Sequence, residues 1–250
     1  MALGLYEITG DLVPLSADER GVSETYQTPA GVYLKLASPK EPSAVANEYI
    51  GAELAKHIRL PIPPHFCGYI RRTSRKAFCS LDATVGGAKL PAINPVLACT
   101  EEPDLCTGVL IFDIWIANVD RHLRNISYQR ERMPHKLTII DHSRALFYYQ
   151  NFNSRFKGDL GIIRPEDKNP HALLYSLSSP DYFHKWITRV KNVSSEYIKE
   201  IVNDAAELGL PATARVYGYD FLLRRRDSIE TLIRSNQAAF RGIRDWGLLW

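Results

Sequence analysis

The chain has 250 residues, of which 45% are hydrophobic and 24% are charged, and its formal net charge is +3. This length suits one large domain or two lobes that share a cleft, and the composition is that of an ordinary globular protein. The positive excess is too slight to indicate nucleic-acid binding. No apolar stretch of about eighteen residues occurs, so the sequence predicts no membrane span.

The cysteines and the N-terminus bear on the cellular compartment. Cys67, Cys79, Cys99 and Cys106 form no Cys-x-x-Cys pair and have no His at zinc-ligand spacing. Free thiols in this number are typical of a reducing compartment. The first residues lack the basic and apolar regions of a signal peptide. We therefore expect a cytoplasmic protein.

Residues 1–95 are predicted to form a small β-rich unit with one helix. Gly31–Leu36 alternates between apolar and polar residues and is predicted to be a strand, with Val22–Gln27 as its hairpin partner. A helix is expected over Ser43–Ile58, with Ser43 as its cap, and the proline-rich segment Leu60–Pro64 ends it. The other elements expected here are the strands Phe66–Ile70 and Lys76–Leu81 and the connecting segment Asp82–Pro95.

Residues 96–250 are predicted to be mainly helical. The expected helices are Leu105–Ala117, Pro180–Val190, Ser194–Glu207 and Tyr217–Ser235. Between them, Tyr148–Pro170 has few periodic apolar positions. This segment is predicted to be either a loop that faces a substrate or an irregular surface connection.

The most informative segment is Asp120-Arg-His-Leu-Arg-Asn125, which is followed by Ile139-Ile-Asp-His142. Phosphoryl transfer needs one carboxylate to orient and deprotonate an acceptor hydroxyl, and oxygen ligands that hold Mg²⁺ against nucleotide phosphates. An Asp and an Asn on one tight loop can meet a second Asp at the end of a β run. The apolar run Val109–Ala117 predicts a buried helix that brings this loop to an interior site.

Each polar residue of this segment suits one role. Asn is a poor base but a good neutral oxygen ligand, so Asp120 is the candidate base, and Asn125 and Asp141 are the candidate Mg²⁺ ligands. His122 could orient the loop through a hydrogen bond to the backbone. The alternative is that the loop is ordinary capping and turn chemistry between two apolar elements.

Lys35 is the candidate phosphate-binding cation. It lies in an alternating strand on the face opposite to Val32 and Leu34, where a lysine is usually exposed to solvent. On the following helix, Glu48 could pair with Lys35 and hold its ammonium group against nucleotide phosphates. Glu53 is the competing partner, and Glu48 is favoured because apolar residues share its helix face.

Gly21-Val-Ser-Glu-Thr25 precedes the lysine strand and could cover the nucleotide phosphates. Backbone N–H groups and the hydroxyl of Ser23 would be the donors of such a loop, for which a plain turn is the alternative. Phosphorylation of Ser23, Thr25 or Thr28 would repel the nucleotide, so self-modification is a further hypothesis.

These segments resemble the HipA-like kinase family, bacterial relatives of the protein and phosphatidylinositol kinase folds. The resemblance spans residues 20–147. It is carried by Gly21-Val-Ser with the Lys35 strand, by Ala46–Ala55 before Leu60-Pro-Ile-Pro, by Phe112-Asp to Asn125, and by Ile140–Leu146. It implies an α+β, bilobal, protein-kinase-like fold, with a small β-rich N-lobe over 1–95 and a larger, mainly helical C-lobe over 96–250.

The resemblance also implies a Mg²⁺- and ATP-dependent kinase. Lys35 would contact the α- and β-phosphates, and Glu48 would orient it. Asp120 would be the catalytic base, and Asn125 and Asp141 would bind Mg²⁺.

Two differences from related kinases limit which of their properties can be expected of this chain. His142-Ser143 stands where eukaryotic kinases have Phe-Gly after the metal-binding Asp, so inferences about their activation switch do not transfer. The N-terminal extension of the longer toxin-type relatives is not expected here. Their antitoxin partnership and DNA association are therefore not carried over to this chain, and the sequence leaves open whether it belongs to a toxin–antitoxin pair.

The leading hypothesis is a kinase that phosphorylates a Ser or Thr hydroxyl of a protein. One alternative is a kinase for a lipid or another small alcohol, because Arg155, Lys157 and Arg164 could meet an anionic headgroup. The other is a nucleotide-binding pseudokinase that serves as an interaction module. Three metal-directed oxygen ligands on one site would be superfluous in such a scaffold, which favours an enzyme.

Overall fold

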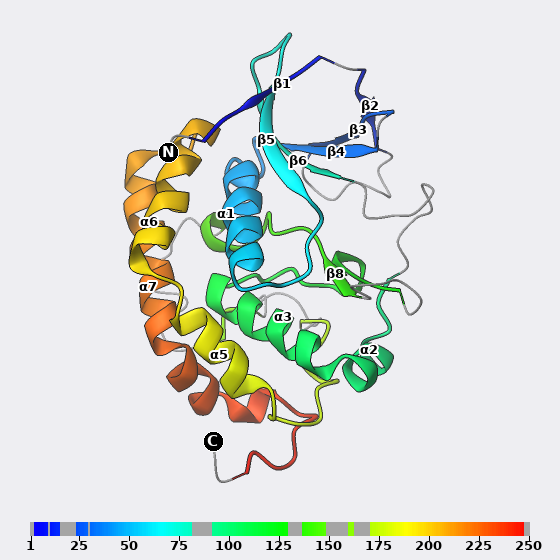
Figure 1. Cartoon of the computed structure of the whole chain (residues 1–250), viewed down its shortest axis with the longest axis vertical. Helices are drawn as coiled ribbons and strands as arrows, with labels where there is room; N and C mark the ends of the chain where they lie inside the picture. Colours follow the sequence, from blue (N-terminus) through cyan, green and yellow to red (C-terminus); the bar gives the residue numbers. More distant parts are fainter. Residues whose placement is uncertain are drawn as a thin grey trace.

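A β-sheet lies at one end of the molecule, helix α1 (Ala44–His57) packs next to it, and the other helices lie beside and below α1 (Figure 1). The structure is a computed structural model that describes residues 3–9, 11–15, 24–29, 31–81, 92–129, 137–148, 160–162 and 171–247. The mixed α+β class predicted from the sequence is confirmed.

Within the described residues, six strands form one sheet in the order β1-β5-β6-β4-β3-β2. Their bounds are β1 Tyr6–Ile8, β2 Val13–Pro14, β3 Glu24–Gln27, β4 Val32–Leu36, β5 His65–Ile70 and β6 Lys76–Leu81. β1 runs parallel to β5, and the other neighbouring strands are antiparallel. The predicted strands and the β3–β4 hairpin are confirmed, whereas β1 and β2 are too short for alternation to reveal them.

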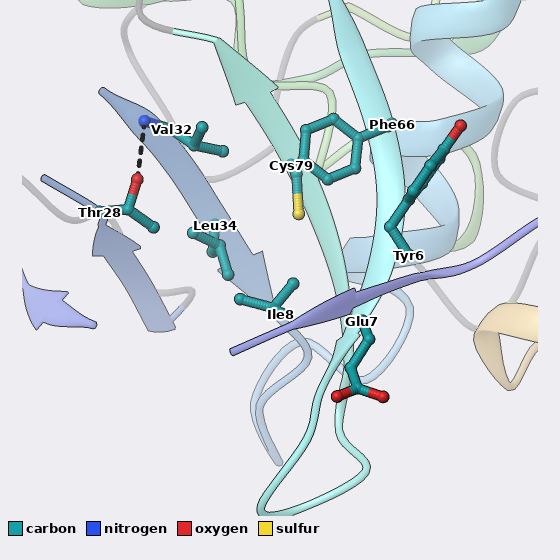
Figure 2. Close-up of a pocket in the computed structure, with 8 residues that line it drawn as sticks. All are labelled: Tyr6, Glu7, Ile8, Thr28, Val32, Leu34, Phe66 and Cys79. Atoms are coloured by element: carbon teal, nitrogen blue, oxygen red, sulfur yellow. Dashed lines mark hydrogen bonds between the residues drawn. The ribbon is translucent and has the colours of Figure 1, made fainter. Parts of the chain in front are cut away.

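The two faces of the sheet have different surroundings. Leu34, Leu36 and Cys79 are buried in a small apolar cluster on the outer face. A pocket of about 440 Å³ lies on this face. Figure 2 shows the residues that line it: Tyr6, Glu7, Ile8, Thr28, Val32, Leu34, Phe66 and Cys79. Because side chains alternate along a strand, Lys35 of β4 faces the other way, toward α1.

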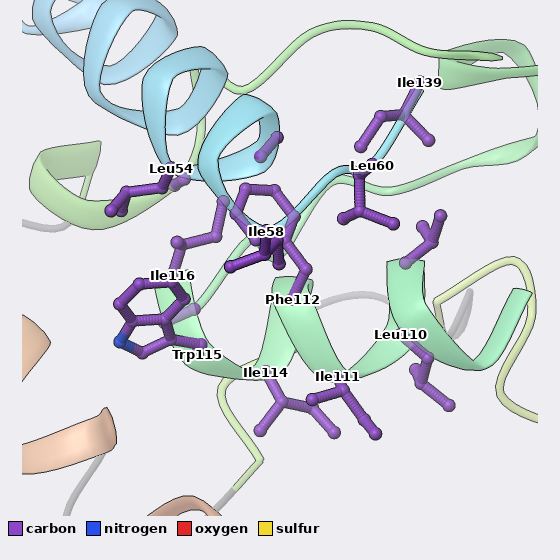
Figure 3. Packing of buried hydrophobic residues seen from close by; sticks show 14 of the residues in the cluster. Leu54, Ile58, Leu60, Leu110, Ile111, Phe112, Ile114, Trp115, Ile116 and Ile139 are labelled. Atoms are coloured by element: carbon purple, nitrogen blue, oxygen red, sulfur yellow. The ribbon is translucent and has the colours of Figure 1, made fainter. Parts of the chain in front are cut away.

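Helix α1 joins the sheet to the helices. Its last turns pack on α3, where Leu54 and Ile58 lie over Phe112 and Trp115 (Figure 3). These side chains are at most 3% exposed. Such burial stabilises the fold by about 1.5–3 kcal/mol per large apolar side chain. The predicted helix over 43–58 is confirmed, although Ser43 at its N-cap makes no side-chain capping bond.

The remaining elements are five helices, a two-stranded hairpin and short 3₁₀ helices within the described residues. They are α2 (Pro95–Glu101), α3 (Pro103–Ile116), α5 (Phe183–Lys191), α6 (Ser195–Asp204), α7 (Ala212–Ser235), β7 (Ile126–Tyr128), β8 (Leu137–Ile139), η1 (Leu123–Asn125), η2 (Leu146–Tyr148), η3 (Ala205–Leu208) and η4 (Gln237–Ala239). No helix in the described ranges is both long enough and apolar enough to cross a membrane.

The four helices expected in this part of the chain are confirmed with shifted ends. α7 begins at Ala212 rather than at Tyr217. α2 was not predicted, although its start carries a sequence signal: Asn94 Oδ1 accepts the N–H of Leu97 at 3.1 Å, and Pro95 occupies the first helical position. Most of the predicted connection 82–95 and most of the predicted loop 148–170 lie outside the described residues.

Candidate active site

The β7–β8 hairpin brings the two candidate metal ligands to the same place. The strands are antiparallel, and Ile126 lies opposite Ile139. Asn125 directly precedes β7, and Asp141 follows β8 after one residue, so both stand at the same end of the hairpin. The N–H of Ile140 donates to the carbonyl of Asn125 at 3.0 Å, which fixes the two segments side by side.

Lys35 makes contacts that join three separate elements. Its Nζ lies 2.6 Å from Glu48 Oε1 on α1 and 2.8 Å from Asp141 Oδ1 after β8. The preferred partner Glu48 therefore contacts Lys35. The competing residue Glu53 instead pairs with other groups, among them His65 Nε2 at 3.0 Å.

The charges of this group stabilise one another. Burial by itself would lower the pKa of Lys35, but the carboxylates of Asp141 and Glu48 raise it above its ordinary value. Burial would raise the pKa of each carboxyl, yet the Lys35 ammonium holds the pKa of Glu48 below its ordinary value and that of Asp141 far below it. All three groups are therefore charged at neutral pH, and their net negative charge favours a cation nearby.

Asp141 has a backbone conformation that few residues adopt. Its φ is 62°, in the left-handed region that non-glycine residues rarely occupy. Ser143 supports the side chain, because its N–H and its hydroxyl donate to Asp141 Oδ1 at 3.1 and 2.6 Å. Strained backbone of this kind concentrates at functional sites, where the surrounding structure holds it in place.

Helix α1 supports the same turn from the other side. Glu48 Oε2 accepts the N–H of His142 at 2.9 Å, and Asn47 Nδ2 donates to the carbonyl of Ser143 at 2.6 Å. A Cβ atom on Gly51 would lie only 2.7 Å from the Cβ of His142, so glycine permits this close approach. The turn after β8 is thus fixed by a helix far away in the sequence.

Asp120 lies on the loop between α3 and η1. Its Oδ2 is 3.1 Å from Nη1 of Arg144, and its side chain is 21% exposed. The backbone N–H of Asp120 donates to Asn118 Oδ1 at 3.2 Å, and its carbonyl accepts Nδ2 of Asn125 at 2.9 Å. A hydrogen bond therefore joins the backbone of the candidate base, Asp120, to the side chain of one candidate metal ligand, Asn125.

His122 contacts the backbone of its own loop. His122 is exposed and its Nδ1 accepts the N–H of Arg124 at 3.2 Å, so it caps the 3₁₀ turn η1. This is a contact with the loop backbone, of the kind expected from the sequence. Gly21 and Ser23, the predicted phosphate-loop residues, lie outside the described residues.

A buried ionic network beneath the loop was not predicted. Asp113 of α3 accepts Arg121 Nε at 2.8 Å and His171 Nε2 at 2.9 Å, and all three side chains are fully buried. Arg121 Nη1 also donates to the carbonyls of Asn125, at 3.2 Å, and of Ile140. The guanidinium thus ties the Asp120 loop to the segment after β8. A charged residue within the apolar run of α3 was the sequence signal, because such a residue needs a buried partner.

Asn125 and Asp141 carry oxygen atoms that fit Mg²⁺. Within the described chain, Asp141 Oδ2 and Asn125 Oδ1 accept no hydrogen bond, whereas Asp141 Oδ1 and Asn125 Nδ2 are engaged. Among the described residues, no three His, Cys, Asp or Glu side chains are grouped to hold a metal. The donor set therefore suits an ion that takes the rest of its ligands from phosphate and water, as Mg²⁺ does.

Comparison with known proteins identifies the class. A family model described as HipA-like kinase matches residues 32–204. The chain belongs to the HipA-like kinase family, which confirms the resemblance inferred from its sequence. No curated protein matches the chain.

The solved structures that are similar to this chain include the following two. One is the proinflammatory kinase CtkA of Helicobacter pylori, with 10% sequence identity, coverage of 92% of this chain and 99% of that chain, and a TM-score of 0.54. The other is HipA of Shewanella oneidensis MR-1, from a complex with HipB and operator DNA, with 12% identity, coverage of 93% and 69%, and a TM-score of 0.39. The likeness to CtkA supports the predicted kinase-like fold.

Proposed function

We propose that the chain is a Mg²⁺- and ATP-dependent kinase that transfers the γ-phosphate of ATP to a Ser or Thr hydroxyl of a protein. Membership of the HipA-like kinase family gives phosphotransfer as the class of reaction. The finer proposal depends on one observation, the contact of Lys35 with both Glu48 and Asp141. A lysine oriented by a glutamate and placed beside a metal-binding aspartate is what nucleotide phosphates require.

In the proposed reaction, the acceptor hydroxyl lies against the carboxylate of Asp120. The hydroxyl oxygen forms a bond to the γ-phosphorus while the bond from that phosphorus to the β–γ bridging oxygen breaks, and the electron pair leaves on ADP. The hydroxyl proton passes to Asp120. The partial exposure of Asp120 supports this role, because a hydroxyl protruding from a protein chain can reach its carboxylate.

The other side chains of the site would hold the phosphates. Lys35, oriented by Glu48, would contact the α- and β-phosphates. Asn125 and Asp141 would hold Mg²⁺, which supplies positive charge that offsets the charge of the phosphates. His122 would keep the loop in shape through its capping bond rather than bind metal.

The test is phosphate incorporation from labelled ATP into separate pools of Ser/Thr peptides, Tyr peptides and phospholipid vesicles. We expect incorporation into the Ser/Thr pool and its loss in Asp120→Asn, because the amide cannot accept the proton. The matched control is Asp227→Asn, which changes an aspartate that is 65% exposed and lies on α7. Full activity of Asp120→Asn would refute the role of Asp120, and transfer to lipid alone would refute the protein substrate.

Two further expectations accompany this proposal. The four cysteines are free and buried, which supports a cytoplasmic location, and cell fractionation tests it. Self-phosphorylation at Ser23, Thr25 or Thr28 stays a prediction. The test is mass spectrometry of the protein after prolonged exposure to ATP. Unmodified hydroxyls at these three positions would refute self-phosphorylation.

A further inference from the structure

Arg144 is the cation that lies beside the candidate base. Its Nη1 is 3.1 Å from Asp120 Oδ2, and its Nε is 2.9 Å from Glu41 Oε1. The Arg144 side chain is 15% exposed and that of Glu41 is 3% exposed. These are not the contacts of an arginine that points into bulk solvent. The guanidinium is instead held in place at the edge of the site by a buried carboxylate.

The backbone around Arg144 and Glu41 is fixed. Asn47 of α1 accepts the N–H of Phe147 at 3.2 Å and donates to the carbonyl of Ser143, so it spans the turn that carries Arg144. Glu41 is placed by a turn in which its N–H donates to Ser38 Oγ at 3.1 Å. A functional group on such a preorganised turn is oriented before any substrate binds.

Lys35 and Arg144 are two cations that lie on different sides of the candidate site. Lys35 contacts Asp141 and Glu48, on the side where nucleotide and metal are expected. Arg144 contacts Asp120, on the side where the acceptor hydroxyl is expected. A hydroxyl that hydrogen-bonds to Asp120 would lie within roughly 6 Å of the Arg144 guanidinium, and the transferring phosphoryl group lies next to that hydroxyl.

We propose that Arg144 is a further catalytic residue, which binds oxygens of the γ-phosphoryl group during its transfer. The inference rests on the proposed kinase function. As the acceptor hydroxyl takes its place on Asp120, N–H groups of Arg144 turn from that carboxylate to the phosphoryl oxygens. Glu41 keeps the guanidinium at the site during this exchange. Planar, always charged arginine suits the charge spread over equatorial phosphoryl oxygens.

The experiment compares Arg144→Met and Arg144→Lys with the unmodified chain. It measures kcat for transfer to a Ser/Thr peptide pool, and the affinities for Mg·ATP and for Mg·ADP with aluminium fluoride, which mimics the transferring phosphoryl group. For Arg144→Met we expect kcat and the affinity for the mimic to fall about 100-fold, while the affinity for Mg·ATP changes less than threefold. Added guanidinium should restore part of kcat, and Arg144→Lys should retain more activity than Arg144→Met.

Arg226→Met is the matched control. Arg226 is similarly shielded, with a side chain that is 13% exposed, and it donates to the carbonyl of Val193 at 2.8 Å, away from the site. Loss of its guanidinium should leave kcat within threefold of the unmodified chain. A similar loss in this variant and in Arg144→Met would show that removing any shielded guanidinium impairs the enzyme, which overturns the assignment.

Failure of this inference and failure of the kinase proposal give different results. An active unmodified chain, together with an Arg144→Met variant that keeps its kcat and its affinity for the mimic, overturns the role of Arg144 alone. A loss of kcat that guanidinium does not restore, with unchanged affinity for the mimic, also overturns it and leaves Arg144 as a structural residue. An unmodified chain that binds no Mg·ATP refutes the proposed function and this inference with it.

Discussion

Lys35 Nζ, on the sheet, lies 2.8 Å from the carboxylate of Asp141, which follows the β7–β8 hairpin. This contact connects the sheet to the β7–β8 hairpin across the candidate site. Glu48 completes it from α1, at 2.6 Å from the same nitrogen. An ammonium group that contacts two carboxylates can exchange one of these contacts for phosphate oxygens while the other contact holds it in place.

Glu48→Gln should lower kcat/KM for ATP by about 10- to 100-fold. Glutamine keeps an oxygen for the N–H of His142 but no longer attracts the Lys35 ammonium, which then stays on Asp141. The comparison is Glu53→Gln, on the same helix, which should remain within threefold of the unmodified chain. Steady-state kinetics with varied ATP measures both, and an unimpaired Glu48→Gln would contradict the role of this pair.

Asn125→Ala should raise the free Mg²⁺ concentration needed for half-maximal activity by about tenfold or more. Its side-chain oxygen accepts no hydrogen bond from the described residues and is one of two protein oxygens proposed for the ion. Asn203→Ala, a change on the exposed face of α6, serves as the control. Removal of Mg²⁺ by a chelator should abolish activity in all three proteins. An unchanged Mg²⁺ requirement in Asn125→Ala would remove this residue from the metal site.

Local patterns were sufficient for the contact between Lys35 and Glu48. Alternation along β4 placed Lys35 on the face opposite to the apolar residues, and helical periodicity placed Glu48 on the packing face of α1. Both signals come from residues close together in the sequence. The same holds for the β3–β4 hairpin and for most helices, which were predicted with errors only at their ends.

The features that escaped prediction depend on contacts between distant segments. His171 contacts Asp113 only after the chain has folded, and no local sequence pattern near either residue predicts the other as its partner. β1 pairs with β5 along three residues, from Tyr6 to Ile8, which is too short a run to show a period of two. Arg144 was visible in the sequence as the residue that follows His142-Ser143. Only the fold shows that its side chain turns toward Asp120.

Arg121→Met should lower the free energy of unfolding by about 3–5 kcal/mol, because it leaves the buried carboxylate of Asp113 without its strongest partner. Replacing both residues, with Asp113→Leu and Arg121→Met together, should recover only part of this stability, because His171 and Asn118 then lose their buried acceptor. It should not recover activity. The reason is that the carbonyls of Asn125 and Ile140 lose their donor in both proteins. Urea denaturation and phosphate transfer are the two measurements. A single variant as stable as the unmodified chain would show that the network contributes little.

His171 should make the stability of the protein depend on pH. Burial lowers the pKa of His171 below its ordinary value of 6.5, against the opposing effect of the Asp113 carboxylate. The native state therefore keeps this imidazole neutral at pH values where the unfolded chain has already bound a proton. In that interval, the free energy of unfolding falls on acidification by up to about 1.4 kcal/mol per pH unit. The stability that the neutral His171 contributes is fully present above pH 6.5.

His171→Gln tests this assignment, because glutamine can still donate to Asp113 but does not titrate. The free energy of unfolding of each protein is measured by urea denaturation from pH 8 down to pH 5.5. The advantage of the unmodified chain over the variant should shrink steadily below pH 6.5. Asp113 does not confound the comparison: Arg121 and His171 overcome the effect of its burial and hold its pKa far below the ordinary range, so it stays charged throughout. A constant difference between the two proteins, or one that grows on acidification, would mean that His171 is protonated in the folded state.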